Sequence, residues 1–396
     1  METKAETAGG AGGRLMSIDA LRGADMLFIM GFASAVVALC SFLGAPDCWL
    51  ARQMTHVQWH GFRHHDTIFP LFLFLAGASW PFSLARQLGR GKSRLAVSLG
   101  ILRRVAILVF LGAVCGGLLS FDFSRTRYCS VLGHIGVCWG LAALASLFVK
   151  DWRKLLAIAA ALLVVHWLVL FLFTAPDDVV AIASEMGRSA TKKVAAYASG
   201  GTDGFSFYGN VAGWIDRCVT PGRLYEAVFD PEGLFAKVSG AALAILGVVA
   251  GTLLRCEKTG GGRKAALLAA SAAASLALCL AWSPWCPVNK KLWTATFVLA
   301  SAAYSFGALA LFYWTIDVRG CRRWTFFFRV IGMNSIAIYM LMDIVPFREV
   351  SKFFVGGLAD IGGNVDLRNF VILLGQLAVE WLVLLFLYRK STFLRV

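Results

Sequence analysis

Long apolar runs, separated by short polar stretches, recur along the whole chain. A helix of roughly 20 apolar residues crosses the roughly 30 Å hydrocarbon core of a bilayer and satisfies its own backbone hydrogen bonds there. No alternating strand pattern competes with this one. The pattern therefore predicts an all-α integral membrane protein, built as a bundle of about ten transmembrane helices. The runs fall at approximately 20–44, 66–86, 96–119, 129–149, 154–174, 234–254, 264–282, 292–316, 325–345 and 369–388.

The composition agrees with this fold class. Of the 396 residues, 58% are hydrophobic and only 15% are charged, and the mean hydropathy is +0.70. This is too apolar for one soluble core. We expect residues 1–16, rich in Gly and Ala and without the continuous apolar segment of a signal peptide, to form a disordered tail. Residues 17–396 then form a single transmembrane domain.

Lys and Arg are concentrated in every second connection. The positive-inside rule places these connections and both termini in the cytoplasm. Topology accounts for much of the net charge of +15, although a basic inner rim could also hold the phosphates of an anionic cofactor. The basic residues of these connections include Arg86, Arg90, Lys92, Arg94, Arg103, Arg104, Lys150, Arg153, Lys154, Arg255, Lys258, Arg263, Lys264, Arg319, Arg322, Arg323, Arg389 and Lys390.

One outer connection, at about 175–233, is far longer than the others. A loop of this length in a compact protein tends to be functional. It contains a stretch that we expect to form a surface helix, "DVVAIASEMGRSATKKVAAYA", followed by "GGTDGFSFYGNVAGWIDR" and "YEAVFDPEGL". The loop could cap a site that faces outward.

The outward-facing segment that begins at residue 54 holds four of the six histidines, His56, His60, His64 and His65, followed at once by Asp66. The i, i+4 spacing of His56 and His60, with Asp66 nearby, could support a metal site. The chain has no H-E-x-x-H motif, however, and "WHGF" interrupts any continuous ligand face. We therefore expect no metal, and we interpret His64 and His65 as interfacial polar residues.

Other polar residues are candidates on either side of the membrane. The outer loops hold Asp216, Asp230, Glu232, Asn289 and Lys290, and four outer cysteines, Cys48, Cys129, Cys218 and Cys286, whose pairing the sequence leaves open. Asp19, Arg22 and Asp25 share one face at the inner end of the first run, where Arg22 can pair with either carboxylate. Asn334, inside the ninth run, serves either helix packing or a site.

Several of these segments carry a family resemblance. The motifs "SIDALRG", "HVQWHGFRHHDTIFPLFLFLAGAS", "SVLGHIG", "GNVAGWIDR", "FDPEGL", "LGVVAG", "PVNKKLWTATFVL" and "GMNSI" follow one another between about Ser17 and Met340. In this order they resemble the heparan-α-glucosaminide N-acetyltransferase family and its bacterial relatives. The resemblance implies a multi-span enzyme that takes acetyl from cytoplasmic acetyl-CoA to the amine of a glucosamine unit on the far side. The histidine of the family's H-x-x-W-x-G motif, regarded as catalytic, falls on His56.

The chain departs from the family pattern at two places. Many relatives have an arginine where this chain has His134, and relatives often carry an asparagine late in the first span, where this chain reads "MGFASAVVAL". If that asparagine holds acetyl-CoA or the acetyl carbonyl, another group must replace it here.

The chemistry of acyl transfer fits these residues. His56 could be the base that removes the amine proton, or it could accept the acetyl group itself. For the acceptor sugar and the oxyanion we expect Trp59, Asp66, Asp216, Asp230, Glu232, Asn289 and Lys290. For acetyl-CoA, the donor substrate, whose pantetheine arm must thread a cavity in the bundle, we expect Arg22, Arg86, Arg103, Arg104, Arg322 and Asn334.

Two rival functions remain open. The first is O-acylation of a cell-envelope glycan. The second is transport of a sugar or an acyl donor without chemistry, although the chain shows no inverted repeat, no obvious broken helix and polar motifs at one face instead of the midplane. We expect the partners to be the lipid bilayer and an amino-sugar or glycan acceptor, with no nucleic acid, and we leave a homodimer open. The expected location is a bacterial inner membrane, with the site open to the periplasm.

The topology predicts which residues are reachable from outside. Single cysteines placed near Asp203 should react with a membrane-impermeant thiol reagent added to intact cells, and those near Lys92 should react only after the membrane is opened. Labelling near Lys92 in intact cells would overturn the orientation.

Overall fold

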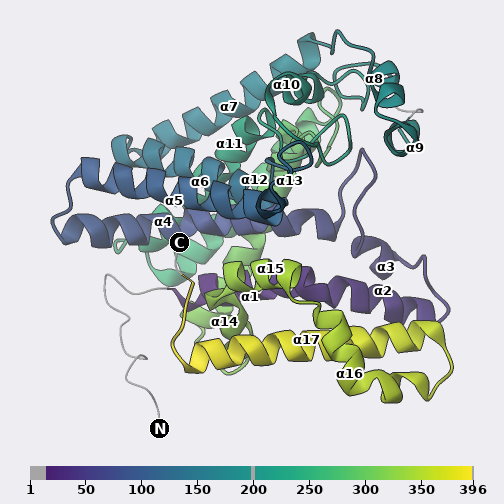
Figure 1. Cartoon of the computed structure of the whole chain (residues 1–396). Coiled ribbons are helices and arrows are strands. Elements are labelled where there is room, and N and C mark those ends of the chain that lie inside the picture. The colour runs from purple at the N-terminus through teal and green to yellow at the C-terminus, as the bar shows by residue number, and fades with distance from the viewer. Residues whose placement is uncertain (1–14, 198–200, 395–396) are drawn as a thin grey trace.

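The computed structural model describes residues 15–197 and 201–394, and every regular element in these ranges is a helix (Figure 1). Nine helices are long and apolar enough to cross a membrane, and a bent pair makes a tenth, so the predicted fold class is confirmed for the described residues. Of the tail expected at residues 1–16, residues 1–14 lie outside the described ranges, and α1 already begins at Met16. The spans and their elements are α1 (Met16–Leu27), η1 (Phe28–Phe32) and α2 (Ala33–Phe42); η2 (His64–Thr67) and α4 (Ile68–Gly89); α5 (Arg94–Cys115); α6 (Val131–Phe148); α7 (Trp152–Leu172); α11 (Ala236–Arg255); α12 (Gly261–Trp282); α13 (Ala295–Phe312) and η5 (Tyr313–Val318); and α17 (Val365–Arg389).

The ninth predicted span is broken. It consists of α14 (Thr325–Met333) and α15 (Ser335–Ile344), which meet at Asn334 at an angle of 67°. No broken helix was obvious from the apolar sequence, and the structure shows this one. The Asn334 side-chain amide donates to the Thr392 carbonyl at 3.0 Å and its oxygen accepts from the Leu394 N–H at 3.1 Å, so the C-terminal segment supports the break.

The helices form two layers (Figure 1). In one, α11 contacts α4, α6 and α7, and α12 pairs with α13. In the other, α1 packs on α14, and α17 packs on α2 and on the amphipathic helix α16 (Phe347–Asp360). Contacts of α1 with α4 and α13 join the layers. The largest apolar core lies in the first layer, and a second core lies among α1, α14, α15 and α17.

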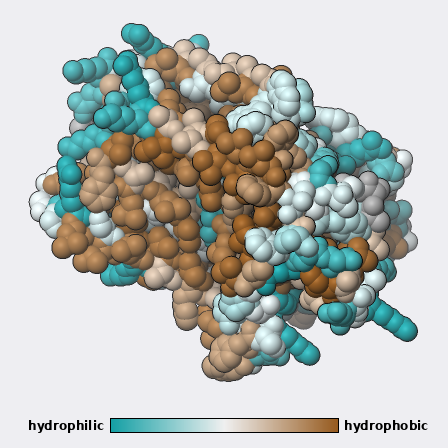
Figure 2. All heavy atoms as spheres, turned by 90° about the horizontal axis from the view of Figure 1, so that it is seen from above, coloured by the Kyte–Doolittle hydropathy of each residue, from teal (hydrophilic) through white to brown (hydrophobic). Residues whose placement is uncertain are grey.

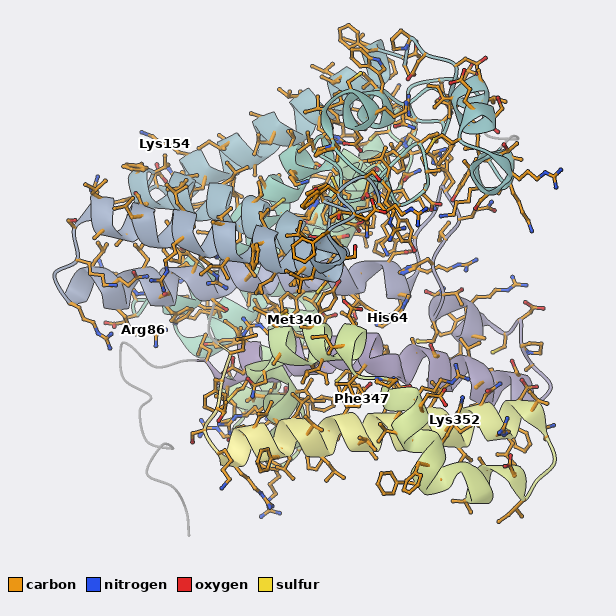
Figure 3. All side chains as sticks on the ribbon, in the orientation of Figure 1. His64, Arg86, Lys154, Met340, Phe347 and Lys352 are labelled. Carbon is orange, nitrogen blue, oxygen red and sulfur yellow. The ribbon has the colours of Figure 1, made fainter. Side chains whose placement is uncertain are left out.

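Polar residues gather at the two ends of the bundle. Figure 3 shows Arg86 and Lys154 at one end and His64 toward the other. Between the ends, Figure 2 shows a broad apolar surface. The span α7 has exposed apolar side chains, among them Leu168 and Phe171. This segregation is what a bilayer requires.

The long connection at about 175–233, which we call the outer connection after the side expected from the sequence, is folded in its described residues. It contains α8 (Val179–Glu185), α9 (Arg188–Ala195) and α10 (Val211–Val219), which enclose an apolar cluster of their own. The single surface helix expected from the sequence is two helices, because Gly187 between them adopts a left-handed φ of 99°. The connection lies at the same end as the histidine segment (Figure 1).

Glycines allow α4 and α11 to approach closely. A Cβ on Gly247 would lie 2.1 Å from the Phe74 carbonyl oxygen, and one on Gly251 would lie 2.1 Å from that of Ala78. Gly247 and Gly251 are four residues apart, the small-xxx-small spacing that lets membrane helices pack backbone to backbone.

This packing predicts the effect of one methyl group. Gly247→Ala should lower the free energy of unfolding by about 1–3 kcal/mol, because the helices must separate. The matched control is Gly100→Ala on α5, where an added Cβ meets nothing within 4 Å and the better helix propensity of Ala should raise stability slightly. Thermal unfolding in detergent measures both. Equal melting temperatures for the two variants would contradict the close crossing.

Candidate functional site

A histidine and a buried carboxylate form a pair at the N-terminal end of α4. His56 lies on the loop after α3 (Trp49–Gln53), and its Nδ1 is 2.8 Å from Oδ1 of Asp66 in η2. Asp66 is fully buried, and its Oδ2 accepts the Arg63 N–H at 3.1 Å. A carboxylate at Nδ1 favours the tautomer with the proton on that nitrogen. Nε2 then carries the lone pair that a base or nucleophile needs.

Lys290 reaches this pair from the loop between α12 and α13. Its Nζ lies 3.0 Å from Nδ1 and 3.3 Å from Nε2 of His56, and 3.5 Å from Oδ1 of Asp66. Burial lowers the pKa of Lys290, and the charge of Asp66 opposes that effect. His56, Asp66 and Lys290 were all candidates from the sequence. The fold brings them together from two segments more than 200 residues apart in the chain.

Hydrogen bonds connect the two loops. The Val288 carbonyl accepts the Gly61 N–H at 2.8 Å, and the Asn289 amide lies 3.5 Å from Nδ1 of His60. Oδ1 of Asn289 accepts the Leu292 N–H at 2.9 Å. Asn289 therefore fixes the turn that presents Lys290. Burial lowers the pKa of His60, which favours its neutral form beside the amide.

The other two clustered histidines pack inward and are half-buried. Nε2 of His64 lies 3.0 Å from the Tyr304 hydroxyl, and its ring contacts Phe28. The His65 ring centroid is 4.4 Å from that of His56. Within residues 15–197 and 201–394, no three His, Cys, Asp or Glu side chains are grouped to hold a metal ion.

Trp59 anchors the histidine loop to the long outer connection. Its indole N–H donates to the Phe205 carbonyl at 2.9 Å, and its ring packs edge-on against Tyr197, Phe207 and Phe229. This is a packing role that the sequence pattern did not distinguish from sugar binding.

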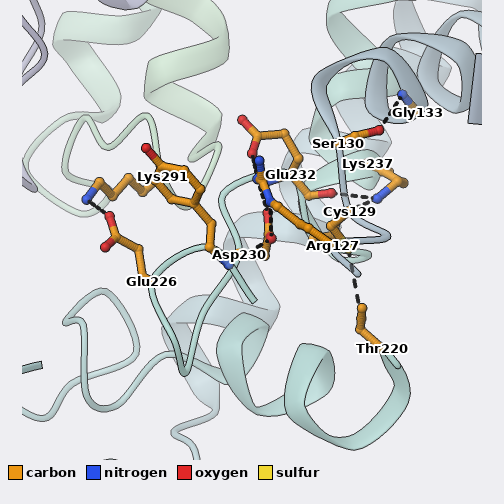
Figure 4. A network of polar contacts seen from close by, with 12 residues as sticks. Arg127, Cys129, Ser130, Gly133, Thr220, Glu226, Asp230, Glu232, Lys237 and Lys291 are labelled. Atoms are coloured by element: carbon orange, nitrogen blue, oxygen red, sulfur yellow. Dashed lines mark hydrogen bonds and ion pairs between the residues drawn. The ribbon is translucent and has the colours of Figure 1, made fainter. Parts of the chain in front are cut away.

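Two acidic residues of the outer connection, Asp230 and Glu232, are paired with a residue that sequence reasoning missed (Figure 4). Arg127, just before α6, donates to both oxygens of Asp230 at 2.8 and 2.7 Å and also pairs with Glu232. Lys237 Nζ donates to the Glu232 and Gly233 carbonyls at 2.7 and 2.9 Å. One signal in the sequence could have found this pairing. Two acidic residues next to an apolar span need a cationic partner if they are buried.

Asp216 lies on α10 and is buried. One of its oxygens accepts the Leu234 N–H at 2.9 Å. Burial raises the pKa of Asp216 from 3.8 to about 7, and the Asp230 charge adds to that effect. The neighbouring Arg217 instead pairs with Asp177 at 2.8 and 2.7 Å.

Two basic cavities lie alongside α4. The first, of about 110 Å³, is lined by Arg22, Arg104, Ser79 and Ser335 among others; Arg22 donates to Ser79 at 2.9 Å, and lies 3.7 Å from Asp19. The second, of about 500 Å³, shares its Arg104 wall and extends to Arg103 and Lys92. Arg104 stacks on Trp139 at 4.1 Å.

The remaining predicted donor-binding residues lie elsewhere. Arg86 donates to the Phe82 carbonyl of its own helix at 3.3 Å, and Arg322 is exposed. Neither is among the described residues that line the two cavities. Asn334 adjoins Ser335 of the first cavity, but its amide binds the C-terminal segment. His134 is buried and stacks on Trp293, with ring centroids 4.5 Å apart.

The cysteines left open by the sequence are unpaired. All ten lie in the described ranges and are free thiols.

A helical bundle with about ten spans and a His–Asp pair at one polar end defines a polytopic membrane protein with a site suited to acid–base or nucleophilic chemistry. Heparan-α-glucosaminide N-acetyltransferase of Mus musculus is 27% identical over 87% of this chain and 56% of its own length. The protein of the same name from Homo sapiens is 28% identical over 83% of the chain and 52% of its own length. This chain is therefore a distant homologue of heparan-α-glucosaminide N-acetyltransferase, and the resemblance noted from the motifs is confirmed. It spans about half the length of these curated relatives, and no family model matches it.

Asp216 predicts a pH-dependent stability. Between about pH 4 and pH 7 the folded state keeps a proton that the unfolded state has released, so the free energy of unfolding falls as the pH rises through this window. Asp216→Asn keeps the oxygen that accepts from Leu234 but cannot ionise. Its melting temperature should fall less than that of the wild type between about pH 5 and pH 8. Parallel curves for the two proteins would show that Asp216 does not titrate in this range.

Proposed function

We propose that this protein is a transmembrane acetyltransferase that moves acetyl from cytoplasmic acetyl-CoA to the amine of a glucosamine-type sugar on the outer side of the membrane. The observation that carries the proposal is the His56–Asp66 pair at 2.8 Å, with Lys290 against the same imidazole. The distant homology to an N-acetyltransferase supports it.

In this reaction the amine nitrogen attacks the thioester carbonyl, an oxyanion forms, and the C–S bond breaks to release CoA. His56 Nε2 takes the proton of the attacking amine and returns it to the departing sulfur. Asp66 holds the imidazole in the required tautomer and stabilises the imidazolium that forms. The same Nε2 could first accept the acetyl group and then pass it to the amine, with the same net products.

Lys290 supports both routes. In the described state its ammonium lies 3.3 Å from Nε2, where it can donate to the lone pair. When a substrate occupies that position, a small rotation of this flexible side chain turns the same donor toward the developing oxyanion, a contact that strengthens in the transition state. Asn289 holds the turn that keeps Lys290 there.

In this proposal the donor and the acceptor approach His56 from opposite ends of the bundle. Arg22, Arg103 and Arg104 give the two cavities beside α4 the cations that CoA phosphates need, and Arg86 and Arg322 add charge at the inner rim. Asn334 has an indirect role in donor binding: it forms the break in the span that places Ser335 in the lining of the first cavity. On the outer side, Trp59, Asp216, Asp230 and Glu232 hold the long connection over His56, where it closes on the acceptor.

Transport without chemistry is the second candidate, because the break between α14 and α15 is a feature of many transporters. An assay of CoA release by the purified protein separates the candidates. Release that depends on a glucosamine oligomer supports N-acetylation, release that depends on a glucose oligomer supports O-acylation, and uptake into vesicles without release supports transport.

His56→Ala should lower acetyl transfer by about 100-fold or more, the scale for loss of a general base, while acetyl-CoA binding is kept. His64→Ala, whose ring lies in the same cluster but bonds to Tyr304, is the matched control and should cost far less. Turnover by steady-state CoA release and donor binding by calorimetry measure the two effects. Near-wild-type turnover of His56→Ala, or activity that follows added zinc and disappears on chelation, would remove His56 from this role.

A further inference from the structure

An apolar groove of about 500 Å³ lies between α12 and α13. Its lining is almost wholly carbon, and alanines such as Ala273 and Ala303 form much of it. Leu276, also in the lining, is about half exposed on the surface of a span that faces lipid. The volume is within the range of small-molecule sites, roughly 300–1,000 Å³. We call this feature the α12–α13 groove.

The outer end of the groove is built by the two loops of the candidate site. Phe62, six residues after His56, and Val288, two residues before Lys290, both line it. The Val288 carbonyl accepts the N–H of Gly61, so the loops are joined where the groove ends. Tyr304 lines it as well, and its hydroxyl lies 3.0 Å from His64.

The groove is separate from the basic cavities. Those cavities are lined by residues of α1, α4, α5, α6 and α15, and none of their described lining residues belongs to the groove. A charged, water-soluble donor suits the arginine-lined cavities. The groove offers no cation and opens between two membrane-spanning helices, so a hydrocarbon chain suits it. The cavities and the groove are therefore separate, and of the three only the groove has residues of the two candidate-site loops, Phe62 and Val288, among its described lining.

From this arrangement we infer that the acceptor is a membrane lipid with an amino-sugar head group, whose hydrocarbon chain occupies the α12–α13 groove. The inference rests on the proposed acetyl transfer and specifies its substrate class. A chain held in the groove places its head group at the outer end, beside Lys290 and His56. The amine then forms the new C–N bond, the thioester C–S bond breaks, and the amine proton passes through His56 to the CoA sulfur.

The test compares two acceptors that share one head group. Dodecyl glucosaminide and methyl glucosaminide are assayed with the protein in lipid nanodiscs. The KM for the dodecyl compound should be lower by about tenfold or more, because its chain is bound along the groove. Ala273→Leu fills the groove and should raise that KM about tenfold, with kcat and KM for the methyl compound unchanged. Ala274→Leu, on the same helix but outside the lining, is the matched control and corrects for partition into the bilayer.

The outcomes separate the groove from the proposed function. Equal loss with both acceptors in Ala273→Leu, or equal KM values for the two acceptors in the wild type, would overturn the groove proposal while acetyl transfer stands. No CoA release with either acceptor would overturn acetyl transfer.

A dodecyl glucosaminide with a photoreactive diazirine in its hydrocarbon chain tests occupancy of the groove directly, without the need for turnover. It should label α12 and α13 in the wild type and in Ala274→Leu, and much less in Ala273→Leu. If bulk phospholipid reduces the labelling as effectively as unlabelled dodecyl glucosaminide does, the groove is an ordinary lipid contact and the proposal is overturned.

Discussion

The buried carboxylate of Asp66 is the group on which the candidate site depends. A charge removed from water costs several kcal/mol unless it is paired and hydrogen-bonded. Asp66 meets this demand with the Arg63 N–H, the His56 imidazole and the nearby Lys290 ammonium. These three partners come from two separate loops, so the requirement to satisfy one carboxylate draws the loops together and orients the imidazole.

The outer connection also contains buried carboxylates that need a cationic partner. Asp230 and Glu232 are buried, and Arg127 pairs with both of them. Trp59 adds an apolar anchor to the same region through Phe207 and Phe229. Because Arg127 pairs with both acids, these three side chains stabilise the fold of the outer connection.

The bundle contains two kinds of internal space. The cavities beside α4 contain the arginine side chains Arg22, Arg103 and Arg104, whereas the α12–α13 groove is apolar. The break at Asn334 lies next to Ser335 of the first cavity, and the Asn334 side chain at the break is hydrogen-bonded to the backbone of the C-terminal segment. Irregular backbone at this depth is tolerated where other parts of the protein satisfy its polar groups.

The sequence by itself determined the membrane fold class, the position of nearly every span and the identity of His56, Asp66 and Lys290 as candidates. It could do so because the bilayer demands long apolar runs, and because a short motif places its histidine directly. Only the tertiary structure decided that Arg127 neutralises Asp230 and Glu232, that Trp59 is a packing anchor, that the ninth run breaks at Asn334, and that Arg22 and Arg104 share a cavity. Each of these depends on contacts between residues distant in the chain, such as Asn334 with Thr392. Hydropathy reports the environment of a segment and carries no information about which distant partner satisfies a polar group.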